Sequence, residues 1–223
     1  MTKGNSKARS EKIYQNLERI SSGSFVDGDE NTASLVSIQG QPVRQVTDSS
    51  RLLRMKKFRF QLLHQWLIQN FLPCKAADIG GGKGLLSYLL NKDGWDVTVI
   101  DPVRQALPNK YKDIRSGARV KIDLQESVVQ IKAEFKMIQA QDFNLLIGMH
   151  AHGCNVEMID AAVKFGVSFV IFPCCVIDEP FYPTLGVHWL ESLAGYATQE
   201  GLMIEPFRLN FKGQNIGLYG KAK

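Results

Sequence analysis

Two groups of residues in this chain have the types and spacing to do chemistry. The first is the glycine-rich stretch Ala77–Ser87, ADIGGGKGLLS, which is followed along the chain by the apolar run Val97–Ile100 and then Asp101. Glycines let the backbone turn sharply and approach a ligand closely, and a helix that begins there directs free N–H groups at it. A carboxylate that ends the next strand can accept both hydroxyl protons of a ribose. The pattern therefore predicts a site for a nucleotide-like ligand.

The second group combines histidines and cysteines that directly follow two later apolar runs, His150, His152 and Cys154 after one and Cys174 and Cys175 after the other. If the two runs are neighbouring strands, these side chains converge. A histidine near its ordinary pKa of about 6.5 can take a hydroxyl proton. The same residues offer nitrogen and sulfur ligands for zinc, or they are buried thiols beside a histidine bonded to the backbone. The spacing is not a standard zinc motif, so no metal is assigned.

Alternating strands and helices must position both groups. The sequence predicts strands at 76–79, 96–100, 119–122, 143–148 and 167–172, helices at 48–71, 85–90, 126–135, 156–165 and 188–199, and a closing pair of strands at 204–212 and 216–219. Such alternation is typical of a doubly wound α/β fold with a parallel sheet, and the final pair adds an antiparallel hairpin. Ligands bind such sheets outside the carboxyl ends of the strands.

Three kinds of ligand-binding motif contain a glycine-rich stretch of this type. A dinucleotide motif, G-x-G-x-x-G, needs a third glycine where Leu85 stands. A Walker phosphate loop needs a glycine in place of Ala77 and a hydroxyl residue in place of Gly84. The remaining pattern, D-x-G-x-G-x-G followed by an acid after the next strand, resembles motif I of the S-adenosylmethionine (SAM) dependent methyltransferases with the Rossmann-like fold. The alternative is a generic glycine-rich turn.

The resemblance implies a seven-stranded sheet with helices on both faces and a C-terminal antiparallel hairpin. It also implies SAM as cofactor, with the glycine loop beside the methionine part and the acid after the second strand on the ribose. The cofactor-binding residues that it implies are Asp78, Gly80, Gly82, Asp101, Pro102 and Asp123. The acceptor side of the site is expected to be lined by the catalytic candidates His150, His152 and Cys174.

The histidines and cysteines of the second group point to a narrower family among these methyltransferases. A strand ending in G-x-H, followed by one ending in P-C-C, is similar to a divergent methyltransferase domain family. That family includes a domain of the glutathione S-transferase C-terminal domain-containing protein and is related to the tRNA acceptor-stem 2′-O-methyltransferases. The resemblance covers residues 50–220, and it departs from the family at His152, which stands where the family has cysteine. The resemblance supports methyl transfer as the activity, and it gives weaker support to any particular substrate.

The excess positive charge lies at the start of the chain. Residues 1–59 hold 11 Lys+Arg and 6 Asp+Glu, whereas residues 60–223 hold 16 of each. The densest basic segment comprises Arg44, Arg51, Arg54, Lys56, Lys57 and Arg59. This segment indicates a phosphate-binding surface, and hence RNA, against the alternative of a solvated helix face. Residues 1–47 are expected to form a flexible polar extension, and residues 48–223 the methyltransferase domain.

Composition bears on the cellular location and on the class of function. The sequence has no apolar run long enough to span a bilayer, no secretory signal at its start and only four cysteines, which predicts a cytoplasmic protein without membrane contact. Three functions compete: an RNA methyltransferase, a methyltransferase of small molecules or protein side chains, and a non-catalytic scaffold that binds SAM. The sequence leaves the oligomeric state open.

Overall fold

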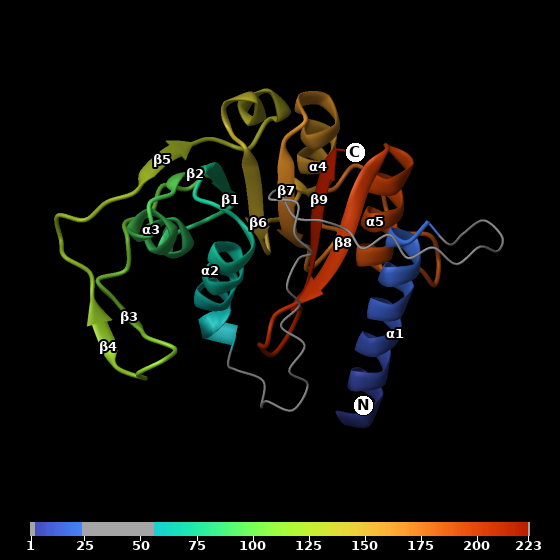
Figure 1. Ribbon diagram of the computed structural model, residues 1–223, viewed down its shortest axis with the longest axis horizontal. Coiled ribbons are helices and arrows are strands. Elements are labelled where there is room, and N and C mark those ends of the chain that lie inside the picture. Colours follow the sequence, from blue (N-terminus) through green and yellow to red (C-terminus); the bar gives the residue numbers. More distant parts are fainter. Residues whose placement is uncertain (1–2, 24–55, 223) are drawn as a thin grey trace.

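A seven-stranded sheet forms the centre of the computed structural model, which describes residues 3–23 and 56–222 (Figure 1). The strands of the sheet are β1 (Lys75–Ile79), β2 (Asp96–Asp101), β5 (Val129–Lys132), β6 (Leu145–Met149), β7 (Ser168–Phe172), β8 (Leu202–Arg208) and β9 (Ile216–Ala222). Their order is β5-β2-β1-β6-β7-β9-β8. The pairs from β5 to β7 are parallel, and β9 runs antiparallel to both β7 and β8. The predicted fold, a parallel sheet closed by a C-terminal antiparallel hairpin, is confirmed.

Helices cover both faces of the sheet because its central strands are apolar on both sides. They are α1 (Lys3–Ser21), α2 (Arg59–Asn70) with the short 3-10 turn η1 (Lys56–Phe58) before it, α3 (Leu85–Lys92), η2 (Met137–Asp142), α4 (Asn155–Phe165) and α5 (Trp189–Gln199). One core joins α1, α4 and α5 to the sheet, and the other joins α2 and α3 to the opposite face. β6 and β7 are buried along their whole length between these two layers.

The strand order reverses between β1 and β6. From β1 the chain moves outward to β2 and β5, and it then returns to the other side of β1 for β6 and β7. β1 and β6 are parallel neighbours, so the loops that follow them begin at the same edge of the sheet, where ligands bind such folds. The glycine-rich loop after β1 and the histidine loop after β6 therefore meet at one edge of the sheet.

The third strand of the parallel sheet differs from the prediction. Residues 119–122 were expected to supply it, but β4 (Arg119–Lys121) pairs only with β3 (Lys110–Lys112), in a separate two-stranded hairpin. The third strand is β5, which lies within the predicted helix 126–135. The helix prediction for this segment is wrong. Apolar and polar residues alternate along Val129–Lys132, which suits a strand, and pairing with β2 decided the conformation.

The beginning of the chain also differs from the prediction of a flexible extension. Helix α1 packs against α5 and β8, with Leu17 fully buried. Tyr14 is buried too, and its hydroxyl donates to the carbonyl of Pro206 at 3.1 Å. Residues 3–21 are therefore part of the folded core, while residues 24–47 and the predicted helix start at 48–55 lie outside the described residues. Within the described parts of the chain, no helix combines the length and apolar character needed to cross a bilayer.

Candidate active site

The glycine loop joins β1 to α3 and brings backbone close to a buried carboxylate. Gly80, Gly82 and Gly84 all have positive φ, at 65°, 55° and 72°. A Cβ on Gly81 would lie 2.6 Å from the carboxylate of Asp78, so no side chain fits there. Gly81 was not among the residues predicted from the sequence, although its place in an unbroken run of three glycines was the available signal.

Asp78 is the buried carboxylate under this loop. It is 1% exposed, and its Oδ2 accepts a hydrogen bond from the hydroxyl of Ser87 at 2.8 Å. Its Oδ1 has no partner among the described residues. Burial raises the pKa of Asp78 to about 6, while the Ser87 hydrogen bonds act against this and the charge of Asp101 adds to it. A buried oxygen without a partner, next to a loop without side chains, is what a polar group of a ligand would satisfy.

This pKa leads to a testable dependence of stability on pH. The folded protein holds the Asp78 proton more tightly than the unfolded chain does, so ionisation of Asp78 lowers the free energy of unfolding as the pH rises through about 6. We expect Asp78→Asn to remove this loss. Its free energy of unfolding relative to the native protein should rise by about 3 kcal/mol between pH 3 and pH 7, since one pKa unit corresponds to ~1.4 kcal/mol.

Urea unfolding at a series of pH values measures the difference in the free energy of unfolding between the variant and the native protein. An effect of the amide that does not depend on pH shifts this difference by a constant and leaves its slope with pH unchanged. Asp96→Asn is the matched control, because Asp96 is exposed at the opposite end of β2. Equal pH profiles for the Asp78 variant and the native protein would contradict the predicted ionisation.

Asp101 ends β2 and binds the backbone on both sides of it. Its Oδ2 accepts from the N–H of Gly82 at 3.0 Å, and its Oδ1 accepts from the N–H of Val103 at 2.8 Å. Each oxygen keeps a second lone pair, and the side chain is half-buried. Pro102 and Val103 are exposed beside it. The carboxylate therefore fixes the glycine loop and remains able to accept further hydrogen bonds.

Asp123 does not end a strand of the main sheet as the sequence analysis expected. It is exposed in the turn after β4, where its Oδ1 accepts from the N–H of Gln125 at 2.9 Å. The expected position of Asp123 after the third strand of the main sheet is wrong, because β5 is the third strand. The structure puts Lys132, at the end of β5, opposite Asp101.

A cavity of about 420 Å³ lies between residues 104–107 and residues 126–130, where the sequence analysis expected no site. The side-chain amide of Gln130 links these two segments, because it accepts from the backbone N–H of Gln105 at 3.3 Å and donates to the carbonyl of Gln105 at 2.7 Å. A Cβ on Gly82 would lie 3.6 Å from Nε2 of Gln105, so the cavity lies beside the glycine loop. Its volume is in the usual range for small-molecule sites.

The loop after β6 packs directly on the glycine loop. A Cβ on Gly80 would lie 3.2 Å from the Cβ of Ala151. The preceding residue, His150, has a φ of 59°, which is uncommon for a residue with a side chain, and its N–H donates to the carbonyl of Phe172 at 3.2 Å. Positive φ at a residue that is neither glycine nor asparagine is a form of strain that clusters at functional sites.

The ring of His150 is largely covered. Its Nε2 is buried and has no hydrogen-bond partner among the described residues. Burial lowers the pKa of His150 to about 4, and the positive charges of Lys56 and Arg59 lower it further. Nε of Arg59 is likewise buried without a described partner. The site thus contains a neutral imidazole and a guanidinium that both have an unused polar atom.

Three of the five residues in the second group come together. Nδ1 of His152 lies 2.8 Å from Sγ of Cys175, its Nε2 lies 3.8 Å from Sγ of Cys174, and the two sulfurs are 3.9 Å apart. Cys154 is separate: it is 8% exposed, it precedes α4, and burial raises its pKa to about 12. The expectation of a buried structural thiol fits Cys154, whereas Cys174 is exposed and Cys175 is half-buried.

Only the end of the predicted basic segment lies within the described residues. Lys56 and Lys57 are exposed on η1, and Arg59 is half-buried at the start of α2. Arg44, Arg51 and Arg54 lie outside the described residues. The charge of Lys56 acts on both His150 and Cys174, which places this basic end beside the histidine and cysteine residues.

The residues present fit a SAM molecule. The fit rests on the unpartnered Oδ1 of Asp78, the lack of side chains on the three consecutive glycines of the loop and the free lone pairs of Asp101. Helix α3 begins at Gly84 without a side-chain cap, so its first N–H groups are available to a ligand carboxylate. The neighbouring cavity of about 420 Å³ adds room for a further part of the ligand.

Strand order and loop geometry together define the class: a Rossmann-like α/β domain of the SAM-dependent methyltransferase fold. The chain is similar to solved structures of this fold. These include the ribosomal protein L11 methylase of Lactobacillus delbrueckii subsp. bulgaricus, at 13% identity over 81% of this chain and 88% of that one, with a TM-score of 0.42. A fibrillarin/Nop5p complex matches at 12% identity, over 75% of this chain and 83% of that one, with a TM-score of 0.45.

Two curated relatives are more similar in sequence. One is named "Probable tRNA (uracil-O(2)-)-methyltransferase" from Caenorhabditis briggsae, at 36% identity over 110 residues. The protein of the same name from Caenorhabditis elegans is 33% identical over 109 residues. Each match covers 46% of this chain, and the chain spans 17% of the length of each relative. No protein-family model matches the chain.

Proposed function

We propose that this chain is a SAM-dependent methyltransferase domain that methylates an oxygen atom of RNA, with tRNA as the substrate class. The observation that carries the proposal is the close approach of Ala151 to Gly80, where an added Cβ would lie 3.2 Å from the Cβ of Ala151, so the histidine loop lies against the glycine loop. The methyl-donor residues and the catalytic candidates thus share one edge of the sheet. The names of the two curated relatives support an oxygen acceptor on tRNA.

Each part of the chain has a separate role in this proposal. Bound SAM supplies an electrophilic methyl group on a sulfonium. Asp101 accepts hydrogen bonds from the ribose, and the glycine loop holds the methionine part above Asp78. Transfer of a methyl group is an in-line displacement, so the chain contributes most by aligning acceptor and donor.

His150 is the residue placed to orient the acceptor. Its unpartnered Nε2 can accept a hydrogen bond from a hydroxyl group and so direct the oxygen lone pair toward the methyl group. His152 and Cys174 lie at the exposed end of the same edge. The sequence lacks the [N/D]-P-P-[Y/F] tetrapeptide of amino methyltransferases after this strand, which agrees with an oxygen rather than a nitrogen acceptor.

Substitution of His150 should affect the reaction and leave cofactor binding intact. His150→Asn keeps a residue that tolerates positive φ, so the loop is retained. We expect the rate constant for methyl transfer to fall on the order of 100-fold, within the range for positioned proton acceptors, with the Kd for SAM unchanged. Single-turnover transfer and calorimetric SAM binding measure the two quantities. An unchanged rate constant would contradict the assigned role.

A basic hairpin extends the RNA-binding surface beyond the predicted segment. Lys110 lies opposite Lys121, and Lys112 lies opposite Arg119, so four cations share one face of β3 and β4. None of the four forms an ion pair with a described carboxylate. Like charges in directly opposed cross-strand pairs destabilise a hairpin. Four cations without a described ion pair on one face of this hairpin support a polyanionic partner.

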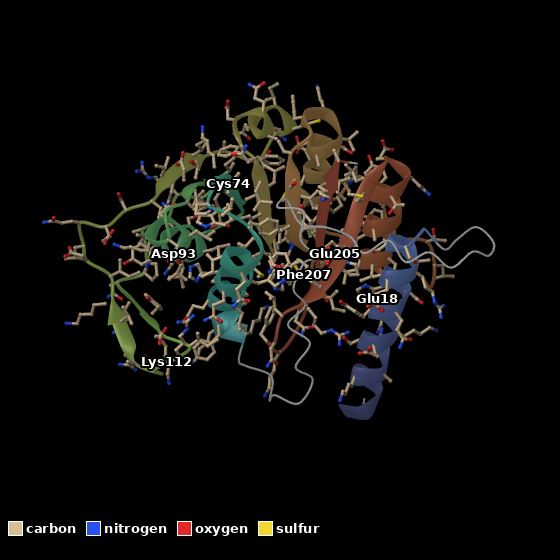
Figure 2. The ribbon with its side chains drawn as sticks, in the orientation of Figure 1. Glu18, Cys74, Asp93, Lys112, Glu205 and Phe207 are labelled. Atoms are coloured by element: carbon tan, nitrogen blue, oxygen red, sulfur yellow. The ribbon has the colours of Figure 1, made fainter. Side chains whose placement is uncertain are left out.

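The hairpin is held beside the basic start of α2. The side chain of Gln61 donates to the carbonyl of Lys112 at 2.8 Å and accepts from the N–H of Ile114 at 2.8 Å. Figure 2 shows Lys112 next to that end of α2. Lys56 and Lys57 lie just before it. One basic surface therefore leads from the hairpin past α2 to the histidine and cysteine residues.

Charge reversal in the hairpin tests this surface. We expect Lys110→Glu with Lys121→Glu to weaken RNA binding at least about 10-fold and to lower the salt dependence of log K by about 2, one for each lost phosphate contact. Lys12→Glu with Lys164→Glu is the matched control, because these exposed lysines lie on α1 and α4 and change the net charge equally. Equal weakening by both pairs would indicate a non-specific charge effect.

The activity itself is tested by transfer of labelled methyl from SAM into cell extract. The label is expected in a fraction that nuclease destroys and protease does not. Label in protein or in small molecules would favour the second function considered above. Absence of label together with tight SAM binding would favour a non-catalytic scaffold.

A further inference from the structure

His152, Cys174 and Cys175 form a cluster that the methyl-transfer chemistry does not require. Each contributes one ligand atom, and the three atoms lie within 4.8 Å of one another. Among residues 3–23 and 56–222, no other group of three histidine, cysteine or acidic side chains meets this condition. The cluster joins the loop after β6 to the loop after β7. His152 and Cys174, which lie in these two loops, are 22 residues apart in the sequence.

Its dimensions match a tetrahedral metal site. With Zn–S bonds of about 2.3 Å, two thiolates on one zinc ion are ~3.8 Å apart. The sulfurs of Cys174 and Cys175 are 3.9 Å apart, and Sγ of Cys174 is 3.8 Å from Nε2 of His152. His152 faces the two sulfurs with different ring nitrogens, Nδ1 toward Cys175 at 2.8 Å and Nε2 toward Cys174, so binding of a shared ion requires this exposed ring to turn one nitrogen toward it.

The loops that carry the cluster are tied together without it. Glu179, which follows the cysteine pair, is 7% exposed, and its two oxygens accept from the N–H groups of Asn155 and Val156 at 3.0 and 3.1 Å. The carboxylate thus binds the N-terminus of α4 and links the loop after β7 to the loop after β6. The ligand positions are held in place before any ion binds, which lowers the entropic cost of binding.

The chemistry of the ligands selects the ion. Two thiolates and one imidazole form a soft set without carboxylates, which favours Zn²⁺ over Mg²⁺ or Ca²⁺. Cys174 and His152 are exposed, so solvent can supply a fourth ligand. We propose that His152, Cys174 and Cys175 bind one Zn²⁺ ion with one exchangeable position, at the edge of the sheet that carries His150. Three protein ligands and an open position are typical of catalytic rather than structural zinc sites.

Metal content and substitution test the proposal on the full chain, purified without a histidine tag. We expect one zinc per chain by elemental analysis. Replacement of zinc by Co²⁺ should produce the thiolate-to-cobalt charge-transfer band and the visible bands of a tetrahedral ion. Cys174→Ser, Cys175→Ser and His152→Gln should each weaken zinc binding at least 100-fold in a chelator competition, with circular dichroism showing that the variants are folded.

Cys74→Ser and His64→Gln are the matched controls. Cys74 is a half-buried free thiol next to β1, labelled in Figure 2, and His64 pairs with Asp93 on the surface. Both controls should retain zinc at native affinity. A chain that binds no zinc, or one whose zinc affinity is unchanged by all three cluster substitutions, would overturn the proposal. These results are independent of methyl transfer, so they can fail while the proposed function holds.

Discussion

Replacement of Asp101 by alanine is expected to weaken binding of SAM at least about 100-fold. Hydrogen bonds to a charged group contribute ~1.5–3 kcal/mol each, and the proposed ribose contacts are two such bonds. The substitution also removes the acceptor for the N–H groups of Gly82 and Val103, so the loop loses its fixed position. Asp101→Asn should be intermediate, because it keeps one carbonyl oxygen and loses the charge.

Isothermal titration with SAM measures this effect, and Asp96→Asn serves as the control. Asp96 lies at the other end of β2 and is exposed, so its substitution should leave the Kd unchanged. If Asp101→Ala binds SAM as tightly as the native chain, the cofactor site is not at the end of β2, and the proposed function fails with it. The same variant separates an enzyme from a scaffold, since only an enzyme loses methyl transfer.

Gly84→Ala is expected to lower the free energy of unfolding by about 3–4 kcal/mol, since left-handed backbone costs ~1–2 kcal/mol and overpacking adds ~1–3. Gly84 has a φ of 72° where α3 begins. A Cβ there would lie 2.7 Å from Cγ2 of Val128 and 3.2 Å from Cγ2 of Val99. The glycine loop therefore packs against both β2 and the residue before β5.

Two further variants separate the steric part of this loss from the backbone part. Gly94 also has positive φ, at 84°, and a Cβ there meets nothing within 4 Å. Gly94→Ala should therefore lower the free energy of unfolding by only ~1 kcal/mol. Val128→Ala should recover part of the loss in the Gly84→Ala background, as a coupling in a double-mutant cycle. Equal losses at Gly84 and Gly94 would contradict the packing described for Val128.

The sequence by itself determined the glycine loop and the alternation of strands and helices. These signals are local: an apolar run, a run of glycines and an amphipathic helix lie within about 20 consecutive residues, and each favours the same conformation. The predicted positions of β1, β2, β6 and β7 each agree with the structure to within two residues. The contact of Asp101 with the glycine loop also follows from local order, since parallel neighbouring strands end at the same edge.

Only the tertiary structure decided which segment supplies the third strand. Both 119–122 and 129–132 are short and apolar at alternate positions, and neither has a distinctive local signal. Pairing with β2 and packing of Val128 near Gly84 favoured β5, which left β4 to pair with β3. The same holds for α1, whose polar sequence is stabilised by packing of Leu17 and Tyr14 on α5 and β8.

For the histidine and cysteine residues, too, the sequence determined one part of the arrangement and the tertiary structure decided the other. Their positions after two strands could be predicted, because strand ends follow from hydrophobic patterning. Which of them meet depends on loop geometry that no local pattern encodes. Cys154 is two residues from His152 but turns inward at the start of α4, while Cys174 and Cys175 reach His152 from the neighbouring strand. The hydrogen bonds of Glu179 to α4 hold that arrangement, and they join residues that are 24 and 23 positions apart in the sequence.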